Sequence, residues 1–188
     1  MHERRFHGEV ERLRSPERLV LLETERVVDT CLEGITARKV LDIGVGSGIF
    51  AEAFAARGLE VTGIDVNPRM IEVAQRFVPQ GHFQVAAAES LPYPENTFDL
   101  VFLGHVLHEA DDAFKTLSEA RRVARLRVVV LEWPYRQEEL GPPLAHRITP
   151  DNVTALALQA GFLHCEEIAL AHMALFRLTA TSKERDDE

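Results

Sequence analysis

The sequence predicts an α/β fold in which a mostly parallel sheet carries helices on both faces. Predicted strands and helices alternate along residues 40–132, which is the order that βαβ units require. Residues 126–132 form a near-continuous aliphatic run, as expected of a central parallel strand that is buried on both faces. Only a short turn separates the last two expected strands, 162–171 and 173–179, so this pair is predicted to be antiparallel.

The first part of the chain contains clear signals for where helices and strands begin. Ser15-Pro16-Glu17 supplies a capping hydroxyl, a first-turn proline and an early acid, and predicts a helix that runs to about Leu32. Val20 and Val27 are expected on its inner face. The elements expected next are strands at 40–43 and 60–65, a helix at 48–57 capped by Ser47, and a helix that starts at Asn67-Pro68.

The second part continues the alternation and then breaks it. The expected strands are 82–87, 97–104 and 126–132, and the expected helices are 111–123 and one that starts at Thr149. Residues 134–148 contain three prolines, a glycine and several charged side chains. Such a loop is unusually long for a compact domain, so we interpret it as a candidate lid.

A glycine turn follows the first strand. Gly44, Gly46 and Gly48 stand at alternate positions, where the backbone can turn sharply and approach a ligand closely. The next strand ends on Asp65, 21 positions after Gly44, where an acidic residue meets a ribose in nucleotide-binding folds. The glycine spacing differs from the Gly-x-Gly-x-x-Gly of dinucleotide sites. Asp42, just before the turn, disfavours a pyrophosphate and suits a positively charged ligand.

These two stretches together resemble a known family. Residues 42–48, Asp-Ile-Gly-Val-Gly-Ser-Gly, followed by Gly63-Ile64-Asp65, resemble the first two motifs of class I S-adenosylmethionine-dependent methyltransferases. The resemblance covers residues 38–180 and is nearest to the ubiquinone and menaquinone biosynthesis methylases (methyltransferase type 11). It implies a doubly wound, three-layer, Rossmann-like sheet of seven strands with the last strand antiparallel. It also implies an enzyme that uses S-adenosylmethionine, releases S-adenosylhomocysteine and methylates a small molecule.

The resemblance assigns roles to the residues around the turn. Asp65 is expected to accept from both ribose hydroxyls, and Asp42 to orient the turn or to take the methionyl ammonium through water. Free amides of the turn are expected to meet the methionyl carboxylate, and Val66 and Met70 to flank the adenine. The predicted cofactor-binding residues are Asp42, Gly44, Gly46, Gly48, Asp65, Val66, Met70, Ala88, Glu89, Gly104 and His105.

One part of the cofactor site departs from the family pattern. Residues 87–93, Ala-Ala-Glu-Ser-Leu-Pro-Tyr, resemble the family's adenine loop, which usually reads Asp-Ala-x-x-Leu-Pro-Phe. Ala87 stands where the family places the acid that accepts from the adenine amino group. Glu89 or the backbone amide of Ala88 is the expected replacement for that contact.

The acceptor side is expected just after the fourth strand, where ligands bind in such sheets. An unperturbed histidine with a pKa of about 6.5 is suited to accept a proton, so His105 is predicted to line the site or to act as a base. His108 and Glu109 could join His105 as metal ligands, but a strand-end turn is a poor scaffold for a metal, and none is predicted. The other acceptor-pocket candidates are Trp133, Tyr135, Arg136, His146 and Arg147.

The composition limits the class of protein and its partners. The 188 residues are 46% hydrophobic, with a net charge of -9, so we expect one domain over residues 1–180 and no nucleic-acid partner. Without a membrane-spanning run or a signal-peptide core, a cytoplasmic location is expected. Residues 1–36 are interpreted as a helical arm, 38–180 as the core, and 181–188 as a disordered tail. Monomer and homodimer both stay open.

Two other functions stay open from the sequence. An NAD-dependent Rossmann oxidoreductase would use a similar sheet, but it predicts glycine at position 49, where the chain has Ile49. A cofactor-binding module or partner subunit without catalysis agrees with the alanine at position 87 and with the short chain. The motifs therefore favour a methyl donor and leave its acceptor open.

Overall fold

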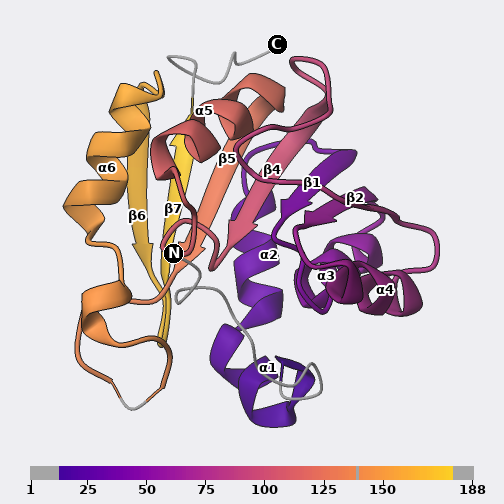
Figure 1. Ribbon diagram of the computed structural model, residues 1–188, viewed down its shortest axis with the longest axis horizontal. Helices are drawn as coiled ribbons and strands as arrows, with labels where there is room; N and C mark the ends of the chain where they lie inside the picture. Colours follow the sequence, from indigo (N-terminus) through magenta and orange to yellow (C-terminus); the bar gives the residue numbers. More distant parts are fainter. Residues whose placement is uncertain (1–12, 139, 180–188) are drawn as a thin grey trace.

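Seven strands form one sheet in the order β3-β2-β1-β4-β5-β7-β6 (Figure 1) within the part of the chain that the structure describes. The structure is a computed structural model that describes residues 13–138 and 140–179. The strands are β1 (Lys39–Ile43), β2 (Glu60–Asp65), β3 (His82–Val85), β4 (Phe98–Gly104), β5 (Ala124–Glu132), β6 (His164–Ala169) and β7 (Ala174–Thr179). The helices are α1 (Pro16–Leu22), α2 (Thr24–Leu32), α3 (Ile49–Ala56), α4 (Pro68–Phe77), α5 (Ala113–Val123), the 3-10 helix η2 (Leu144–His146) and α6 (Pro150–Gln159).

The directions of the strands confirm the predicted fold class. β1 pairs in parallel with β2 and β4, β2 with β3, and β4 with β5. β7 is antiparallel to both β5 and β6, and its arrow in Figure 1 points against the others. The parallel strands therefore bring their carboxyl ends to one edge of the sheet, the lower edge in Figure 1.

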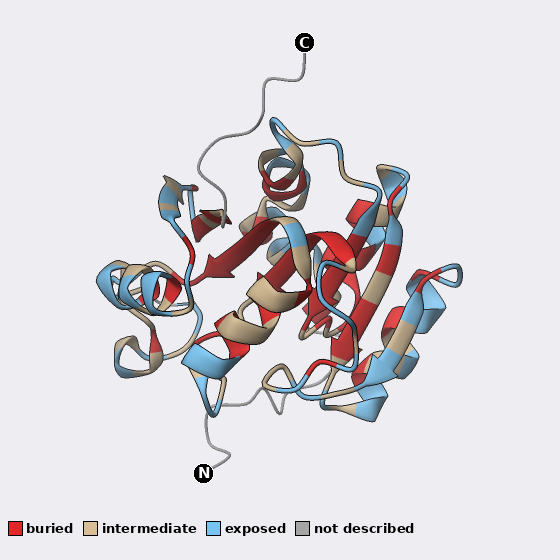
Figure 2. Cartoon of the chain, turned by 90° about the horizontal axis from the view of Figure 1, so that it is seen from above, coloured by how far each residue is buried: buried red, intermediate tan, exposed pale blue. Residues whose placement is uncertain are grey.

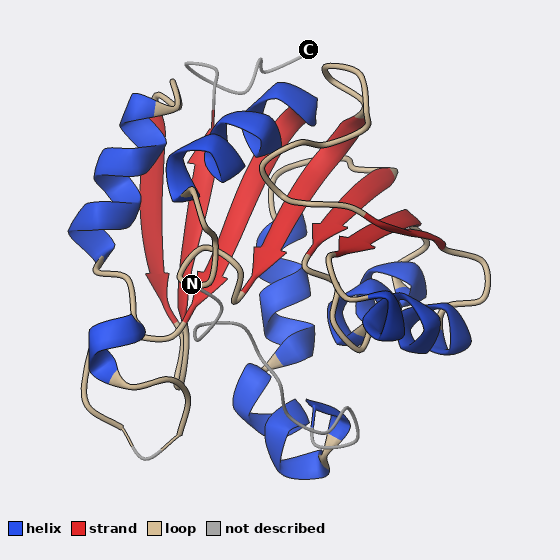
Figure 3. Cartoon of the chain, viewed as in Figure 1, coloured by secondary structure: helices blue, strands red, loops and turns tan. Residues whose placement is uncertain are grey.

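Alternating side chains of the strands build a separate core on each face. Val40 and Phe102 pack with α2, α3 and α4 on one face, whereas Leu41 and Leu103 pack with α5 and α6 on the other. Successive strand residues point to opposite faces, so both cores follow from the aliphatic runs in the sequence. Figure 2 shows the buried strands between partly exposed helices, and Figure 3 shows α5 crossing in front of them. The result is the expected three-layer arrangement.

The predicted helix at 16–32 is wrong in one respect, because it is two helices. Glu23 separates them with φ 46° and ψ 42°, a left-handed conformation that costs a non-glycine residue about 1–2 kcal/mol. Its carboxylate accepts from the Ala171 amide at 2.7 Å and from the Arg26 guanidinium at 2.9 Å. These contacts hold the break, and α1 lies below the carboxyl edge of the sheet (Figure 1).

The break also corrects the expected inner face of the arm. Val20 is 76% exposed, whereas Val27 is fully buried as predicted. The end of α2 is fastened to the sheet by the buried Arg127 of β5, whose guanidinium donates to the carbonyls of Cys31 and Glu33 at 3.0 and 2.7 Å. α2 is thus part of the body of the protein, and α1 alone reaches over the edge of the sheet.

Two local predictions are corrected by the backbone. Gly48, with φ 79°, is the residue that precedes α3, and no side-chain hydrogen bond caps that helix. Ser47 is therefore not the cap, since this position needs the left-handed conformation that glycine adopts readily. β3 ends at Val85 and not at the expected Ala87. The predicted cap at Asn67 is confirmed, because its side chain accepts from the Arg69 amide at 3.0 Å.

Parts of the predicted domain layout lie beyond what is described. Residues 1–12 of the expected arm and the expected tail at 181–188 are outside the described residues, so the division into arm, core and tail stays a prediction. Among the helices within 13–138 and 140–179, none is long and apolar enough to cross a membrane.

Candidate functional site

A cavity of about 1060 Å³ opens at the carboxyl edge of the sheet. The glycine turn after β1 and the ends of β2 and β4 form one side of it, and α1 and residues 140–142 form the other. Its volume is at the upper end of the range for small-molecule sites, about 300–1,000 Å³. Of the eleven predicted cofactor-binding residues, ten line this cavity: Asp42, Gly44, Gly46, Asp65, Val66, Met70, Ala88, Glu89, Gly104 and His105.

Asp65 fastens the glycine turn to the end of β2. One carboxylate oxygen accepts from the Gly46 amide at 3.0 Å, and the other accepts from the Asn67 amide at 2.8 Å. Because a carboxylate has about four acceptor positions, these two bonds fix the side chain at the cavity wall. The structure thus gives this acid a role in shaping the turn that the spacing alone did not reveal.

The three glycines of the turn have positive φ but different surroundings. A Cβ on Gly44 would lie 2.3 Å from Cγ2 of Val106, whereas a Cβ on Gly46 would meet only the Gly44 carbonyl oxygen, at 3.9 Å. A Cβ on Gly48 would lie 3.0 Å from the Cα of Ala74 in α4, and Gly48 does not line the cavity. Gly48 therefore allows two helices to pack closely, and Gly46 leaves room for a ligand.

Asp42 is a buried carboxyl group at the floor of the cavity, only 2% exposed. Burial raises its pKa well above the ordinary value, and the negative charge of Asp65 raises it further, against a hydrogen bond from the Ala51 amide. A cation placed beside such a carboxyl group stabilises its ionised form. The site is thus prepared to ionise when a positively charged ligand arrives.

The expected adenine end of the cavity is lined by small and apolar side chains. Val66 is partly exposed and Met70 is buried, and both line the cavity together with Ala88 and Glu89. The Glu89 carboxylate also accepts from the Asp111 amide at 3.2 Å, which ties the adenine loop to the start of the α5 region. The wall carries a carboxylate at Glu89, the position expected to replace the family acid.

His105 occupies a strained position immediately after β4. Its φ is 61°, and its amide donates to the Leu131 carbonyl at 2.8 Å, which holds the strained backbone. The ring lies 5.1 Å from the Trp133 ring, and both ring nitrogens are shielded from solvent with no hydrogen-bond partner among the described residues. Burial, and then the charges of Arg18 and His108, lower the pKa of His105 well below its ordinary value. His105 is thus a neutral, polar side chain at pH 7, and it lines the cavity.

His108 is held in a buried ion pair that the sequence did not predict. Its Nδ1 lies 2.6 Å from Oε2 of Glu132, and its amide donates to Oε1 at 3.1 Å. Burial opposes a charge on this ring, but the hydrogen bond and the charge of Glu132 outweigh burial and raise the pKa of His108. No group of three or more His, Cys, Asp or Glu within residues 13–138 and 140–179 is arranged to hold a metal ion.

The candidate lid at 134–148 is organised around a buried arginine. Trp133 lines the cavity as predicted, whereas Tyr135, Arg136, His146 and Arg147 do not. The Arg147 guanidinium donates to four loop carbonyls at 2.7–2.9 Å, those of Pro134, Arg136, Leu140 and Pro142. The acceptor-pocket role predicted for Arg147 is therefore replaced by a role in holding residues 140–142 against the cavity.

The helical arm contributes a second wall of the cavity. The Arg14 guanidinium donates to the Ser47 carbonyl at 2.8 Å, pairs with Glu52 and lies 3.5 Å above the centre of the Phe77 ring. These contacts fix α1 across the glycine turn and against α4. The arm residues that line the cavity are Leu13, Ser15, Glu17, Arg18, Leu21 and Leu22.

A sequence comparison decides the family of this fold and site. The family described as "Methyltransferase domain" matches residues 41–130, which run from β1 to β5. Over residues 41–130 the chain matches a methyltransferase domain. The resemblance read from residues 42–48 and from Asp65 is thereby confirmed.

Curated relatives of this methyltransferase domain are longer than the chain. Demethylmenaquinone methyltransferase of Thermotoga maritima is 33% identical over 129 residues, 66% of this chain and 53% of that protein. The uncharacterized methyltransferase YcgJ of Bacillus subtilis is 38% identical over 92 residues, 46% of this chain and 36% of that protein. The chain thus spans about half the length of these relatives or less. A crystal structure of a SAM-dependent methyltransferase from Aquifex aeolicus shares the fold, with a TM-score of 0.80, 23% identity, and 92% and 97% of the two chains covered.

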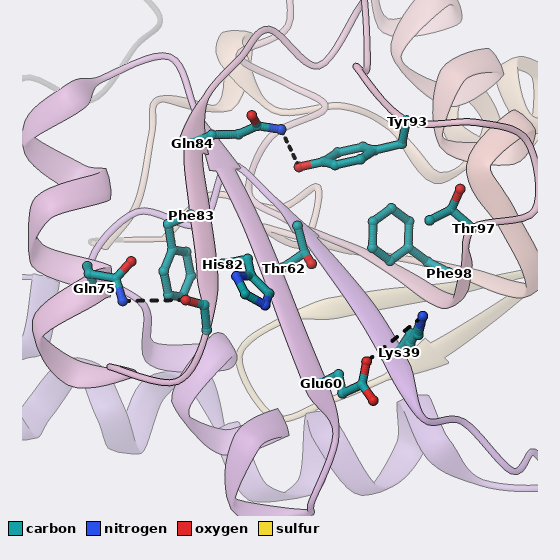
Figure 4. Close-up of a pocket in the computed structure, with 11 residues that line it drawn as sticks. Lys39, Glu60, Thr62, Gln75, His82, Phe83, Gln84, Tyr93, Thr97 and Phe98 are labelled. Atoms are coloured by element: carbon teal, nitrogen blue, oxygen red, sulfur yellow. Dashed lines mark hydrogen bonds and ion pairs between the residues drawn. The ribbon is translucent and has the colours of Figure 1, made fainter.

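The methyltransferase domain has a smaller hollow of about 580 Å³, lined in part by residues at the amino ends of the strands (Figure 4). Lys39 and Glu60 form an ion pair across it at 3.9 Å, and the Gln84 amide donates to the Tyr93 hydroxyl at 2.7 Å. These four polar side chains are therefore paired within the protein. The opposite edge, where the parallel strands have their carboxyl ends, is where ligands bind in such sheets.

Three important residues around the cavity were missed or misplaced by sequence reasoning. Glu132 closes a buried aliphatic strand, and an acid in that position is a signal for a buried polar partner. Arg18 lies directly after the helix-start signal Ser15-Pro16-Glu17, which places it in the first turn of a helix. Arg147 carries no such signal, because its loop contacts arise only in the folded chain.

Proposed function

We propose that the protein is an S-adenosylmethionine-dependent methyltransferase that acts on a small-molecule acceptor. The observation that carries the proposal is the convergence, at one cavity, of the buried Asp42, a glycine turn fastened by Asp65, and the unpartnered ring of His105. The acid and the turn suit a ligand with a positive charge and a ribose. The histidine lies at the end of β4, where the reacting groups of two ligands can meet.

The lining fits S-adenosylmethionine in several respects. A Cβ on Gly46 would make one ordinary contact, with the Gly44 carbonyl oxygen at 3.9 Å, so a ligand can lie against the turn. Asp65 stands at the end of β2 for a ribose diol, and Val66 and Met70 supply apolar contact for a base. When bound, the donor supplies an electrophilic methyl group on a sulfonium. The burial of Asp42 makes its carboxylate a partner that gains from a nearby cation.

The protein's own contribution to the reaction is positioning and the exclusion of water. α1 and residues 140–142 cover the cavity, which strengthens electrostatic interactions inside it. The neutral ring of His105 offers one donor and one acceptor, enough to hold an acceptor hydroxyl in line with the methyl group. Its lowered pKa makes it a weak base, so we assign His105 the orientation of the acceptor.

A flat hydroxylated aromatic molecule is the acceptor class that we propose. The relative from Thermotoga maritima is named for demethylmenaquinone, and the cavity here includes aromatic walls from Trp133 and Phe50. The His105 ring lies against Trp133 with its planes tilted by 36°. A planar ring with a hydroxyl group complements these surfaces.

The test is transfer of a labelled methyl group from S-adenosylmethionine to a series of dihydroxyarenes and reduced naphthoquinones. We expect labelled product from the wild type, and a rate about 10-fold lower or more for His105→Ala. His146→Ala, in the loop but outside the cavity, is the matched control and is expected to keep the wild-type rate.

Each rival function has its own outcome in this test. Binding of S-adenosylhomocysteine without transfer to any arene would replace the enzyme by a cofactor-binding module. Binding of NAD in place of S-adenosylhomocysteine would support the oxidoreductase.

A further inference from the structure

The cavity is acidic except at one point. Its lining includes the carboxyl groups of Glu17, Asp42, Asp65, Glu89 and Glu109, and Arg18 is the one arginine or lysine among the described residues that line it. A ligand with a carboxylate would meet repulsion over most of this surface. Arg18 is therefore the position where an anionic group of a ligand is favoured.

Three amides of the glycine turn are already used within the protein. The Val45 amide donates to the Ile64 carbonyl at 2.9 Å, and the Gly48 amide donates to the Val45 carbonyl at 2.9 Å. The Gly46 amide donates to Asp65 at 3.0 Å. These three backbone donors are thus committed to the protein, which leaves fewer turn amides for a ligand carboxylate.

α1 carries Arg18 into the cavity from a fixed base. Arg14, just before α1, donates to the Ser47 carbonyl, and Arg18 lies in the first turn of α1 and lines the cavity. The Arg18 guanidinium is partly buried and lies within electrostatic range of Glu109 and His105. Burial lowers its pKa and Glu109 raises it, and an arginine remains charged in either case. Arg18 thus brings a permanent positive charge to the wall of the cavity.

We propose that Arg18 binds the carboxylate of the methionyl group of the methyl donor. This inference rests on the proposed function, since it assigns one further contact to the same ligand. The anchor at Ser47 places α1 over the glycine turn, on the side of the cavity where the methionyl group is expected. The arm is therefore part of the site for the methyl donor. The competing assignment is that Arg18 binds a carboxylate of an acidic methyl acceptor.

The test compares two ligands that differ in the amino acid group. S-adenosylhomocysteine carries the methionyl-type carboxylate, whereas 5′-methylthioadenosine keeps the nucleoside and thioether and lacks the carboxylate. Isothermal titration measures both with the wild type, Arg18→Met, Arg18→Lys and the control Arg76→Met, whose arginine is exposed on α4. We expect Arg18→Met to raise the Kd of S-adenosylhomocysteine about 10- to 100-fold and to leave that of 5′-methylthioadenosine within about twofold. Arg18→Lys is expected to fall between, and Arg76→Met to match the wild type.

The outcomes separate the inference from the function beneath it. Retained binding of 5′-methylthioadenosine by Arg18→Met shows that the variant is folded. An unchanged Kd for S-adenosylhomocysteine overturns the inference and assigns Arg18 to the acceptor. Equal weakening of both ligands also overturns it, because the effect then lies in the fold of the arm. Failure of the wild type to bind either ligand counts against the proposed function itself.

Discussion

The glycine turn offers a paired experiment, because two of its glycines are needed for different reasons. Gly46 lies at the cavity, and its only neighbour for an added Cβ is the Gly44 carbonyl oxygen at 3.9 Å. Gly48 lies away from the cavity, and its added Cβ would be 3.0 Å from the Cα of Ala74. We therefore expect Gly46→Ala to impair binding and Gly48→Ala to impair folding.

The magnitudes follow from the backbone and the neighbours. Both residues have positive φ, 52° for Gly46 and 79° for Gly48, which costs an alanine about 1–2 kcal/mol. Gly48→Ala adds a close contact with backbone that cannot rotate away, about 1–3 kcal/mol more. The free energy of unfolding should therefore fall by about 1–2 kcal/mol for Gly46→Ala and about 2–5 kcal/mol for Gly48→Ala.

Urea denaturation and titration with S-adenosylhomocysteine measure the two effects separately. Gly46→Ala is expected to weaken binding about 10-fold or more, since its methyl group enters the ligand space. Gly48→Ala is expected to bind as the wild type does, once the folded fraction is taken into account. The reasoning is refuted if Gly46→Ala binds normally, or if Gly48→Ala loses binding without losing stability.

Three further predictions concern Asp42, Glu132 and the glycine that packs on Trp133. Asp42→Asn should raise the free energy of unfolding at pH 8 by about 1–2 kcal/mol and weaken the binding of S-adenosylhomocysteine. Because the pKa of Asp42 is raised in the folded protein, this gain in stability should vanish below about pH 3, where the carboxyl group is protonated in both states. Urea titrations at the two pH values measure the difference. Glu132→Gln should lower the free energy of unfolding by about 3 kcal/mol at pH 6. This loss should shrink as pH rises through the raised pKa of His108, because the ion pair stabilises the fold fully only below the unfolded pKa of histidine, about 6.5. Thermal melts between pH 5 and 9 measure the loss. Gly141→Ala should lower the free energy of unfolding by about 1–3 kcal/mol and shift the fluorescence emission of Trp133, since the added Cβ would lie 2.6 Å from that ring. Unchanged stability and emission would contradict the close contact between Gly141 and Trp133.

Most of the fold could be predicted because its signals are local. Alternating strands and helices, the cap at Asn67 and the antiparallel pair at the end depend on short stretches of sequence. The break at Glu23 could not be predicted, since glutamate rarely adopts a positive φ and the helical pattern continues through it. Its cause is distant: the Ala171 amide, which the chain brings to Glu23 only on folding.

The candidate site divides in the same way. The residues at strand ends, such as Asp42, Asp65 and His105, could be predicted because parallel topology gathers strand ends at one edge. The buried contacts of Glu132 and Arg147 could not, because a polar side chain is satisfied by partners that lie far away in sequence. Sequence therefore indicated the donor side of the cavity more fully than the acceptor side.

The central claim is that the cavity at the carboxyl edge binds S-adenosylmethionine, and direct titration tests it. We expect the wild type to bind S-adenosylmethionine and S-adenosylhomocysteine, and Asp65→Ala to bind both at least about 10-fold more weakly, since it loses the ribose contact and the bond to Gly46. Binding of NAD without binding of either sulfur ligand, or wild-type affinity in Asp65→Ala, would contradict the account.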